Sequence, residues 1–462
     1  MALIKSISGI RGTIGGKAGD NLTPIDVVQF VSAFITLLKN GEEKPLTIII
    51  GRDARVSGEI INKLACSTLQ SLGVNVIDLG LSTTPTVEMA VIQHKADGGI
   101  ILTASHNPMQ WNALKLLNAN GEFISAADGA KVLEIIEKQD YKFAEINQLG
   151  TYSTYDRAIE DHIDTILKLD LVNVDAIKRA HFAVALDCVN STGGIALPKL
   201  LEALGVTNVT VLNGEPTGVF AHNPEPLPQH LHDLSNLIAR GKFDVGFVVD
   251  PDVDRLAIVR EDGQMFVEEY TLVAVADYIL QHTKGNTVSN LSSTRALRDV
   301  SARYGVEYNA SAVGEVNVVE KMKATNAIIG GEGNGGVIYP ALHYGRDALV
   351  GIALFLSYMA TSGKSCTEIR RQYPAYVISK NKIELRPGMD VKAILAHIAD
   401  KYSDKQVNTI DGVKIDFDNG WVHLRPSNTE PIIRIYAEAE TESLADNMAT
   451  KIIGDIREFL RG

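Results

Sequence analysis

The stretch that decides the fold is Gly98-Gly-Ile-Ile-Leu102, followed directly by Thr103-Ala-Ser-His-Asn-Pro108. Its first half is an apolar run typical of a buried strand, and the serine, asparagine and proline of its second half are common turn formers. Serine is a weak nucleophile at neutral pH unless a base or a cation lies beside it. His106 is adjacent to Ser105, and Lys115 follows ten positions after the serine. The stretch therefore predicts either a nucleophilic serine at a strand end or an ordinary polar turn.

Strand and helix patterns alternate around this stretch. Two apolar runs at residues 46–50 and 74–79 predict strands, and the segment between them places its apolar residues on one helical face and ends at Gly73. Apolar strands separated by helices indicate a mixed or parallel sheet that is covered on both faces. The sequence therefore predicts an α/β fold.

This alternation restarts twice, first after a polar, weakly periodic stretch at residues 139–155 and again near residue 256. In each of the three rounds, the last apolar strand runs into a polar turn, at Ser105, Asp250 and Glu332. Ligands of open α/β sheets gather beyond the carboxyl ends of the strands. We therefore expect the three turns to face one cleft.

A smaller α+β unit is expected at the C-terminal end, from about Tyr373, because the alternation changes there. The predicted organisation is three similar mixed-sheet α/β domains and a smaller fourth domain. Their predicted ranges are residues 1–150, 151–255, 256–372 and 373–462.

Composition excludes several classes of protein. The chain of 462 residues has 44 basic and 56 acidic side chains and a net charge of −12, which disfavours a nucleic-acid surface. Its three cysteines are too few and too scattered for a disulfide framework or a cysteine zinc site, which favours a reducing compartment. Residues 1–19 lack a signal-peptide pattern, and the apolar stretch 348–360 is too short for a membrane span. We expect a soluble cytoplasmic protein that binds neither nucleic acid nor membrane.

The second turn, Asp250-Pro-Asp-Val-Asp-Arg255, places three carboxylates at alternate positions. Such hard oxygen donors suit Mg²⁺ or Ca²⁺, and three carboxylates this close repel one another without a cation. An EF-hand is the obvious alternative, but Arg255 stands where that loop requires glycine, and the flanking runs are strands. The pattern favours a divalent cation held by Asp250, Asp252 and Asp254, with a solvated acidic turn as the alternative.

The third turn, Gly330-Gly-Glu-Gly-Asn-Gly-Gly336, combines glycines with a carboxylate and an amide. It lacks the lysine and hydroxyl residue of a Walker A loop, so a nucleotide phosphate is not the expected ligand. Glu332 and Asn334 offer the acceptors and donors that sugar hydroxyls need. A simple hairpin turn is the alternative.

A fourth polar segment, Arg425-Pro-Ser-Asn-Thr-Glu-Pro431, follows a strand-like run in the C-terminal unit. A guanidinium, two hydroxyls, an amide and backbone N–H groups can surround a phosphate, and Arg434 can add a second cation. The alternative is a polar loop between two strands.

Together with Gly9-Ile-Arg-Gly12, these four segments resemble the α-D-phosphohexomutase family, whose members interconvert sugar 1- and 6-phosphates. The resemblance covers essentially the whole chain and keeps the family's motif order. It implies a heart-shaped protein with four domains around a central cleft. It also implies one Mg²⁺ per chain, a sugar phosphate as ligand, a hexose 1,6-bisphosphate as activator, and a monomer or homodimer.

The resemblance also implies a role for each candidate residue. Ser105 carries the phosphoryl group and binds the metal together with the three aspartates. Arg11, Lys115 and Arg255 balance charge around the transferring phosphoryl group, and His106 beside the serine is a further candidate catalytic residue. Glu332 and Asn334 hold the sugar, and the phosphate that does not react is bound by Arg425, Ser427, Asn428, Thr429 and Arg434.

Two departures from the family pattern bear on the substrate. The sugar loop ends in Asn334-Gly-Gly336, where many members have Ser-Gly-His, and Glu315 stands where glucose- and mannose-type members carry histidine. A carboxylate suits the ammonium of an amino sugar, so we expect glucosamine 6-phosphate as the substrate, with Glu315 as its partner if it reaches the cleft. Glu315 as a solvated carboxylate at a helix start is the alternative. A glucose or mannose phosphate mutase, an idle sugar-phosphate sensor and a phosphatase are the competing functions.

Overall fold

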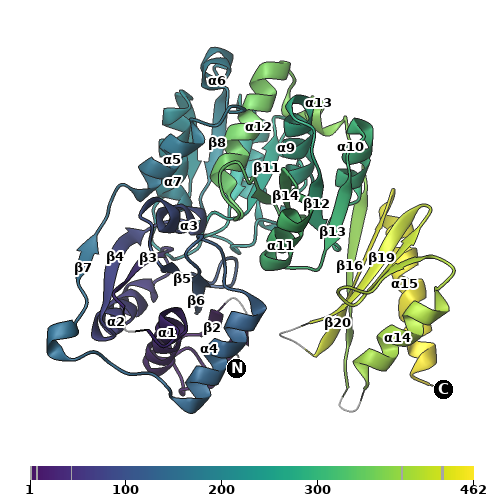
Figure 1. Ribbon diagram of the computed structural model, residues 1–462. Coiled ribbons are helices and arrows are strands. Elements are labelled where there is room, and N and C mark those ends of the chain that lie inside the picture. Colours follow the sequence, from purple (N-terminus) through teal and green to yellow (C-terminus); the bar gives the residue numbers. More distant parts are fainter. Residues whose placement is uncertain (1–2, 7–8, 43, 387–388, 428–430, 462) are drawn as a thin grey trace.

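The computed structural model describes residues 3–6, 9–42, 44–386, 389–427 and 431–461. Four separate sheets organise these residues, with seven, four, four and five strands in chain order. Helices pack around the sheets, as Figure 1 shows. The predicted fold class, three mixed α/β units followed by a smaller unit, is confirmed by these sheets.

The first unit holds the seven-stranded sheet, in the order β1-β2-β6-β5-β3-β4-β7. Its elements are β1 (Leu3–Ser6), β2 (Gly9–Thr13), α1 (Pro24–Lys39), β3 (Leu46–Arg52), α2 (Gly58–Ser71), β4 (Val74–Leu81), α3 (Thr84–Gln93), β5 (Gly98–Leu102), β6 (Trp111–Leu117), α4 (Ala126–Lys138), the 3₁₀ turn η1 (Ile146–Gln148) and β7 (Tyr152–Thr154). The apolar strands β3 and β5 lie at the centre, with helices on both faces.

The second and third units hold the two four-stranded sheets. The second unit contains α5 (Ala158–Ile166), α6 (Val174–Ala180), β8 (Ala183–Asp187), α7 (Gly193–Ala203), β9 (Asn208–Leu212), η2 (Pro228–His230), α8 (His232–Arg240), β10 (Val245–Val249) and β11 (Leu256–Arg260). The third contains α9 (Glu269–His282), β12 (Thr287–Asn290), α10 (Ala296–Tyr304), β13 (Tyr308–Ser311), α11 (Glu315–Thr325), β14 (Ile329–Glu332), β15 (Gly336–Ile338), α12 (Ala348–Ser362) and α13 (Cys366–Arg370).

The three α/β units share one strand order, so the recurrence inferred from the sequence is structural. The order is β6-β5-β3-β4 in the first unit, β11-β10-β8-β9 in the second and β15-β14-β12-β13 in the third. In each unit the first two of these strands pair antiparallel and the others pair parallel. The turns that carry Ser105, Asp250 and Asn334 therefore occupy equivalent hairpin positions.

The fourth unit is an antiparallel sheet in the order β16-β20-β19-β18-β17, with two helices on one face. It contains β16 (Val377–Glu384), α14 (Val391–Lys401), β17 (Gln406–Asn408), β18 (Val413–Phe417), β19 (Gly420–Pro426), β20 (Ile432–Ala439) and α15 (Glu442–Phe459). Apolar residues of α14, α15 and the central strands form a separate core.

Two of the predicted domain boundaries fall too early. Strand β7, after residue 150, pairs parallel with β4 and so completes the first sheet. Strand β11, after residue 255, pairs antiparallel with β10 and belongs to the second sheet. Each strand belongs to the unit of the strand with which it pairs, and the local sequence pattern does not reveal that partner. The boundary after residue 372 stays a prediction.

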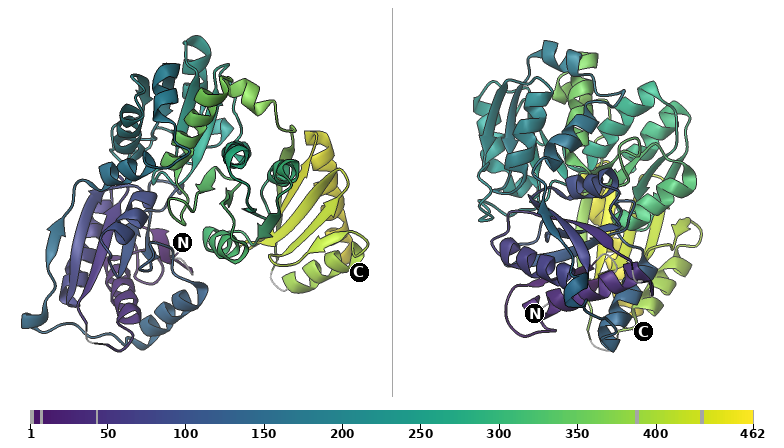
Figure 2. Two further views of the ribbon diagram at one scale, coloured as in Figure 1. Left: turned by 45° about the horizontal axis from the view of Figure 1, so that its top comes forward. Right: turned by 60° about the vertical axis from the view of Figure 1, so that its left-hand side comes forward.

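The units follow one another along an arch, with the first and fourth at its two ends (Figure 2). One core cluster runs through the second and third units, from Ile159 to Tyr373. These two units are therefore packed as one body between the outer ones. Among the described residues, no helix is both long and apolar enough to cross a membrane.

Candidate active site

The turn after β5 holds Ser105 in a sparsely populated backbone conformation. Ser105 has φ of +48°, a left-handed value that is uncommon for residues other than glycine. Its N–H donates to Thr103 Oγ1 at 2.9 Å, and the Thr103 hydroxyl donates to Asp53 Oδ2 at 2.6 Å. Backbone strain of this kind persists only where the surroundings hold it, and it clusters at functional sites.

Arg55, which sequence reasoning missed, is the main support of this turn. Its fully buried guanidinium donates to Asp53 and to four backbone carbonyls of the turn. The accepting oxygens are those of Ser105 at 2.5 Å, Asn107 at 2.7 Å, Pro108 at 2.8 Å and Trp111 at 2.9 Å. The only signal in the sequence is that Arg55 lies just after the end of another apolar strand.

The serine hydroxyl faces the aspartate turn of the second unit. Ser105 Oγ donates to Asp250 Oδ2 at 2.7 Å and lies 3.4 Å from His106 Nδ1. Asp250 Oδ1 accepts the backbone N–H groups of Asp254 and Arg255. The structure therefore brings together the first two predicted turns, which lie 145 positions apart.

The three aspartates of this turn converge. One oxygen from each of Asp250, Asp252 and Asp254 lies within 4.8 Å of the others, and all three residues are buried. Val253 between them has φ of +63°, rare for a β-branched residue, and its side chain is buried in the core. This arrangement can hold a divalent cation.

The donor set fits such a cation. Asp252 Oδ1 and Asp254 Oδ1 are buried and accept no hydrogen bond from any described residue. Burial and the neighbouring aspartates raise the pKa of Asp250 well above its ordinary value. Hard oxygen ligands and an excess of buried negative charge are what Mg²⁺ requires. The three aspartates that the sequence predicts to hold a cation thus converge in the described structure.

Lys115 neutralises part of this charge. Its Nζ lies 2.8 Å from Asp252 Oδ2 and 3.6 Å from Asp254 Oδ2. Burial alone would lower the pKa of Lys115, but the two aspartates raise it above its ordinary value, so the side chain stays protonated. Arg11 lies at the same turn, where Nη1 donates to Asn107 Oδ1 at 2.9 Å.

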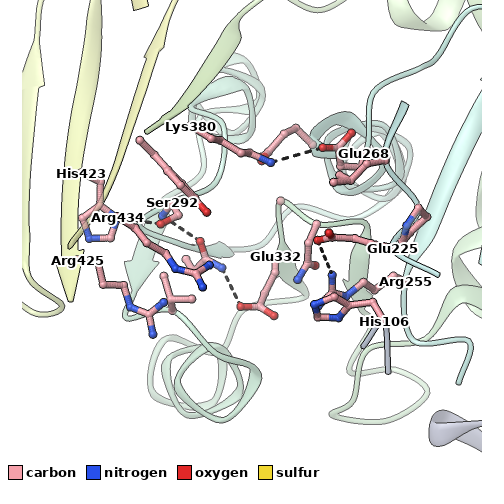
Figure 3. A pocket seen from close by; sticks show the side chains of 18 residues that line it. His106, Glu225, Arg255, Glu268, Ser292, Glu332, Lys380, His423, Arg425 and Arg434 are labelled. Carbon is pink, nitrogen blue, oxygen red and sulfur yellow. Dashed lines mark hydrogen bonds and ion pairs between the residues drawn. The ribbon is translucent and has the colours of Figure 1, made fainter. Parts of the chain in front are cut away.

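His106 and Arg255 line a pocket of about 270 Å³ that all four units enclose. The positive charge of Arg255, then burial and Arg11, lower the pKa of His106 to about 2. His106 is therefore neutral at physiological pH, and its unprotonated ring nitrogen can accept a hydrogen bond. Figure 3 shows both side chains at one end of the pocket.

Glu332 and Asn334 of the predicted sugar loop line this pocket, and Figure 3 shows Glu332 between its two ends. Glu332 Oε1 accepts from Asn290 Nδ2 at 2.8 Å and from the Gly314 N–H at 3.0 Å. Gly335 has φ of +88°, and a Cβ there would lie 2.5 Å from the Leu256 carbonyl oxygen, so only glycine fits this turn. The turn thus fixes both polar side chains.

Arg346, a second residue that sequence reasoning missed, joins the sugar loop to the aspartate turn. Its buried guanidinium lies 2.6 Å from Glu332 Oε2, 2.6 Å from Asp254 Oδ2 and 3.1 Å from Glu315 Oε2. Glu315 also accepts the Arg346 N–H at 3.0 Å and is not among the residues lining the pocket. Glu315 does not meet the condition set for it as the partner of the substrate, because it does not line the pocket and its carboxylate lies against Arg346. The alternative of a solvated carboxylate is wrong as well, because Glu315 is buried.

The opposite end of the pocket is basic. Arg425 on β19 and Arg434 on β20 are cross-strand partners, and both line the pocket, as do His423 and Lys380 (Figure 3). Like charges directly opposite each other in a sheet are destabilising, and an anion between them compensates. Arg425 Nε also pairs with Asp411 Oδ2 at 3.0 Å. This end can bind a phosphate.

Ser427 continues the turn after Arg425, and its N–H donates to the Ile432 carbonyl oxygen at 2.9 Å. The predicted phosphate-binding residues Asn428 and Thr429 lie outside the described residues. Ser427 is not among the residues that line the pocket, whereas the other described site residues of the prediction lie in the pocket or in the cluster around Ser105.

Comparison with known proteins identifies the family. Four family models match successive parts of the chain. They are the phosphoglucomutase/phosphomannomutase alpha/beta/alpha domains I, II and III, at residues 3–143, 160–263 and 268–376, and the C-terminal domain, at residues 381–454. The chain belongs to the phosphoglucomutase/phosphomannomutase family. The resemblance to phosphohexomutases is thereby confirmed, and with it the prediction of an enzyme.

Relatives of this family match over nearly the full chain. A phosphoglucomutase/phosphomannomutase of Thermococcus kodakarensis is 37% identical over 98% of this chain and 99% of its own length. A phosphoglucosamine/phosphogalactosamine mutase of Sulfurisphaera tokodaii is 31% identical over 98% of both. The crystal structure of a putative phosphomannomutase from Thermus thermophilus, 25% identical, superposes with a TM-score of 0.82 over the whole of both chains.

Proposed function

We propose that this phosphohexomutase interconverts glucosamine 6-phosphate and glucosamine 1-phosphate through a phosphorylated Ser105 and a bisphosphorylated sugar. The observation that carries the proposal is one pocket with two distinct ends. Ser105 and the aspartate turn lie beside the end formed by His106 and Arg255, and the Arg425–Arg434 pair forms the other. A sugar between them presents one phosphate to each end.

The Ser105 end provides what phosphoryl transfer demands, which is mostly positioning and neutralisation of charge. The hydrogen bond to Asp250 aims the Ser105 hydroxyl, and Lys115, Arg11 and Arg255 supply positive charge around it. His106 Nδ1 lies 3.4 Å from Ser105 Oγ, so a neutral imidazole borders the reacting hydroxyl.

Asp250, Asp252 and Asp254 would hold one Mg²⁺, with Ser105 Oγ or its phosphate as a further ligand. The bound cation neutralises the oxygens of the phosphoryl group in transfer. The residues around it keep the aspartates in place: Lys115 and Thr84 bind Asp252 Oδ2 at 2.8 and 2.6 Å.

At the far end, Arg425, Arg434 and Ser427 bind the phosphate that does not react, with Asn428 and Thr429 as further candidates. Glu332 and Asn334 bind the sugar hydroxyls between the ends. A mutase must accept its intermediate in two orientations. One fixed phosphate site and one hydroxyl-binding loop serve both if the bisphosphate turns end over end. A hexose 1,6-bisphosphate acts as activator because it can reload Ser105.

Glucosamine carries an ammonium group that needs an anionic side chain in the pocket. Glu315 does not line the pocket and so cannot be that partner. Glu268 lines the pocket, its Oε2 is buried without a hydrogen bond from any described residue, and its Oε1 lies 3.8 Å from Lys380 Nζ. We assign the ammonium to Glu268. The second candidate is a glucose or mannose phosphate mutase, which the name of the 37% identical relative favours.

The test is a set of coupled isomerisation assays with the 6-phosphates of glucosamine, glucose and mannose, giving kcat/KM for each. We expect the highest value for glucosamine 6-phosphate. A preference for glucose or mannose phosphate rejects the substrate, and release of free phosphate in place of isomerisation rejects the mutase.

A further inference from the structure

A second cluster of metal-ligating side chains lies away from the aspartate turn, where the first three units meet. It consists of His162 on α5, His343 in the loop before α12, and Asp347, which caps α12. One ligand atom from each lies within 4.8 Å of the others, and all three residues are buried. Both Nε2 atoms face Asp347 Oδ2, at 2.9 Å from His162 and 3.2 Å from His343.

The outer nitrogens of both histidines face helix α3 of the first unit, which packs against α5. His162 Nδ1 lies 3.0 Å from Thr86 Oγ1, and His343 Nδ1 lies 3.4 Å from Glu88 Oε2. Glu88 is 1% exposed, and neither of its carboxylate oxygens accepts a hydrogen bond from any described residue. The buried carboxylate of Glu88 thus faces Nδ1 of His343, the ring nitrogen that does not face Asp347.

A neutral His343 cannot donate a hydrogen bond to both of its carboxylate neighbours. A neutral imidazole carries a single N–H, yet His343 lies between two carboxylates, Glu88 at Nδ1 and Asp347 at Nε2. If Nδ1–H donates to Glu88, the lone pair of Nε2 faces the oxygen of Asp347. A cation shared by the His162, His343 and Asp347 atoms removes this conflict. A divalent cation also balances the two buried negative charges.

We propose that His162 Nε2, His343 Nε2 and Asp347 Oδ2 bind one divalent transition-metal ion of the zinc class. Two imidazoles and a carboxylate are zinc-type ligands, unlike the all-oxygen set of the aspartate turn. Ligands at 2.0–2.1 Å around tetrahedral zinc lie about 3.3 Å apart, close to the 2.9 and 3.2 Å found here. A carboxylate behind a ligating histidine, as Glu88 is behind His343, is the usual second partner.

This ion would hold together the first three units, which contribute residues to the active site. Its ligands come from the second unit and from the segment just before α12, and Glu88 comes from the first unit. Asp347 directly follows Arg346, which binds both Asp254 and Glu332. The metal would therefore fix the backbone that carries Arg346.

Two competing arrangements need no metal. One puts a proton on Glu88, whose pKa is raised by burial and by the charge of Glu315, and the other puts a second proton on His343, so that each ring nitrogen donates to a carboxylate. A titration with Co²⁺ distinguishes metal binding from these metal-free arrangements. The full chain is stripped with a chelator, supplied with excess Mg²⁺ to fill the aspartate turn, and titrated with Co²⁺. We expect one Co²⁺ per chain with the strong visible absorption of a tetrahedral nitrogen-containing site, displaced by Zn²⁺.

Three variants locate the ion. His343→Gln should abolish the absorption, and Asp252→Asn, which alters only the aspartate turn, should keep it. Glu88→Gln keeps an acceptor behind His343 but removes its charge, and it should weaken binding about 10- to 100-fold. If His343→Gln does not fold, the Glu88→Gln variant and the titration of the unaltered chain still show whether the ion binds at His343.

Absence of the tetrahedral absorption in the unaltered chain overturns the proposal and leaves a proton on Glu88 or on His343. Absorption that Asp252→Asn abolishes and His343→Gln or Glu88→Gln leaves unchanged also overturns it, because the ion then sits in the aspartate turn.

Discussion

Replacing Arg346 with lysine tests whether the sugar loop and the aspartate turn act as one assembly. The guanidinium reaches Asp254, Glu332 and Glu315 at 2.6, 2.6 and 3.1 Å. Lysine keeps the positive charge, but a single ammonium cannot span three carboxylates that a planar fork spans. At least one charge-assisted hydrogen bond is lost, at a cost of about 1.5–3 kcal/mol. If the lost bond orients Asp254 or Glu332, kcat/KM falls roughly 10- to 150-fold.

The assay is coupled isomerisation, with thermal unfolding to show that each variant folds. Arg303→Lys is the matched control, because Arg303 is half-exposed and lies 3.9 Å from Asp277, a contact whose loss costs little. We expect Arg303→Lys to match the unaltered chain. A folded Arg346→Lys within about twofold of the unaltered kcat/KM refutes the coupling of the two turns.

Three further predictions concern the metal, the substrate and pH. Exhaustive chelation should abolish isomerisation and Mg²⁺ should restore it, and full activity after chelation contradicts the aspartate site. Glu268→Gln should lower the ratio of kcat/KM for glucosamine over glucose phosphate more than Glu315→Gln does; an equal effect rejects Glu268 as the ammonium partner. Burial lowers the pKa of His423 from 6.5 in the unfolded chain to about 4 in the folded one. Between these two pH values, His423 therefore binds a proton in the unfolded chain but not in the folded chain. Stability should fall as pH drops through that window, and His423→Gln should reduce the fall in Tm; an unchanged fall contradicts the assignment.

The sequence predicted the turns of the site because each is a local pattern. An apolar run such as Gly98–Leu102 indicates a buried strand, and the polar residues after it mark the strand's carboxyl end. The convergence of Ser105 and Asp250 followed from the topology of α/β sheets. Strands β7 and β11 were assigned to the wrong units because only their pairing places them.

The supporting residues could not be predicted in the same way. Arg55 binds carbonyl oxygens 50 to 56 positions away, and Arg346 binds a carboxylate 92 positions away. An arginine in isolation gives no sign of such partners, since most arginines are on the surface. For the same reason, Glu315 looked available for substrate until the structure showed Arg346 beside it.

The central claim is that Ser105 carries the phosphoryl group. The direct measurement is intact-mass analysis after incubation with a hexose 1,6-bisphosphate, on the unaltered chain and on Ser105→Ala. Ser105→Ala should keep its fold and lose isomerisation by several orders of magnitude, because no route to the bisphosphate remains. We predict one added phosphoryl group on the unaltered chain and none on Ser105→Ala. A phosphorylated or fully active Ser105→Ala would contradict the account.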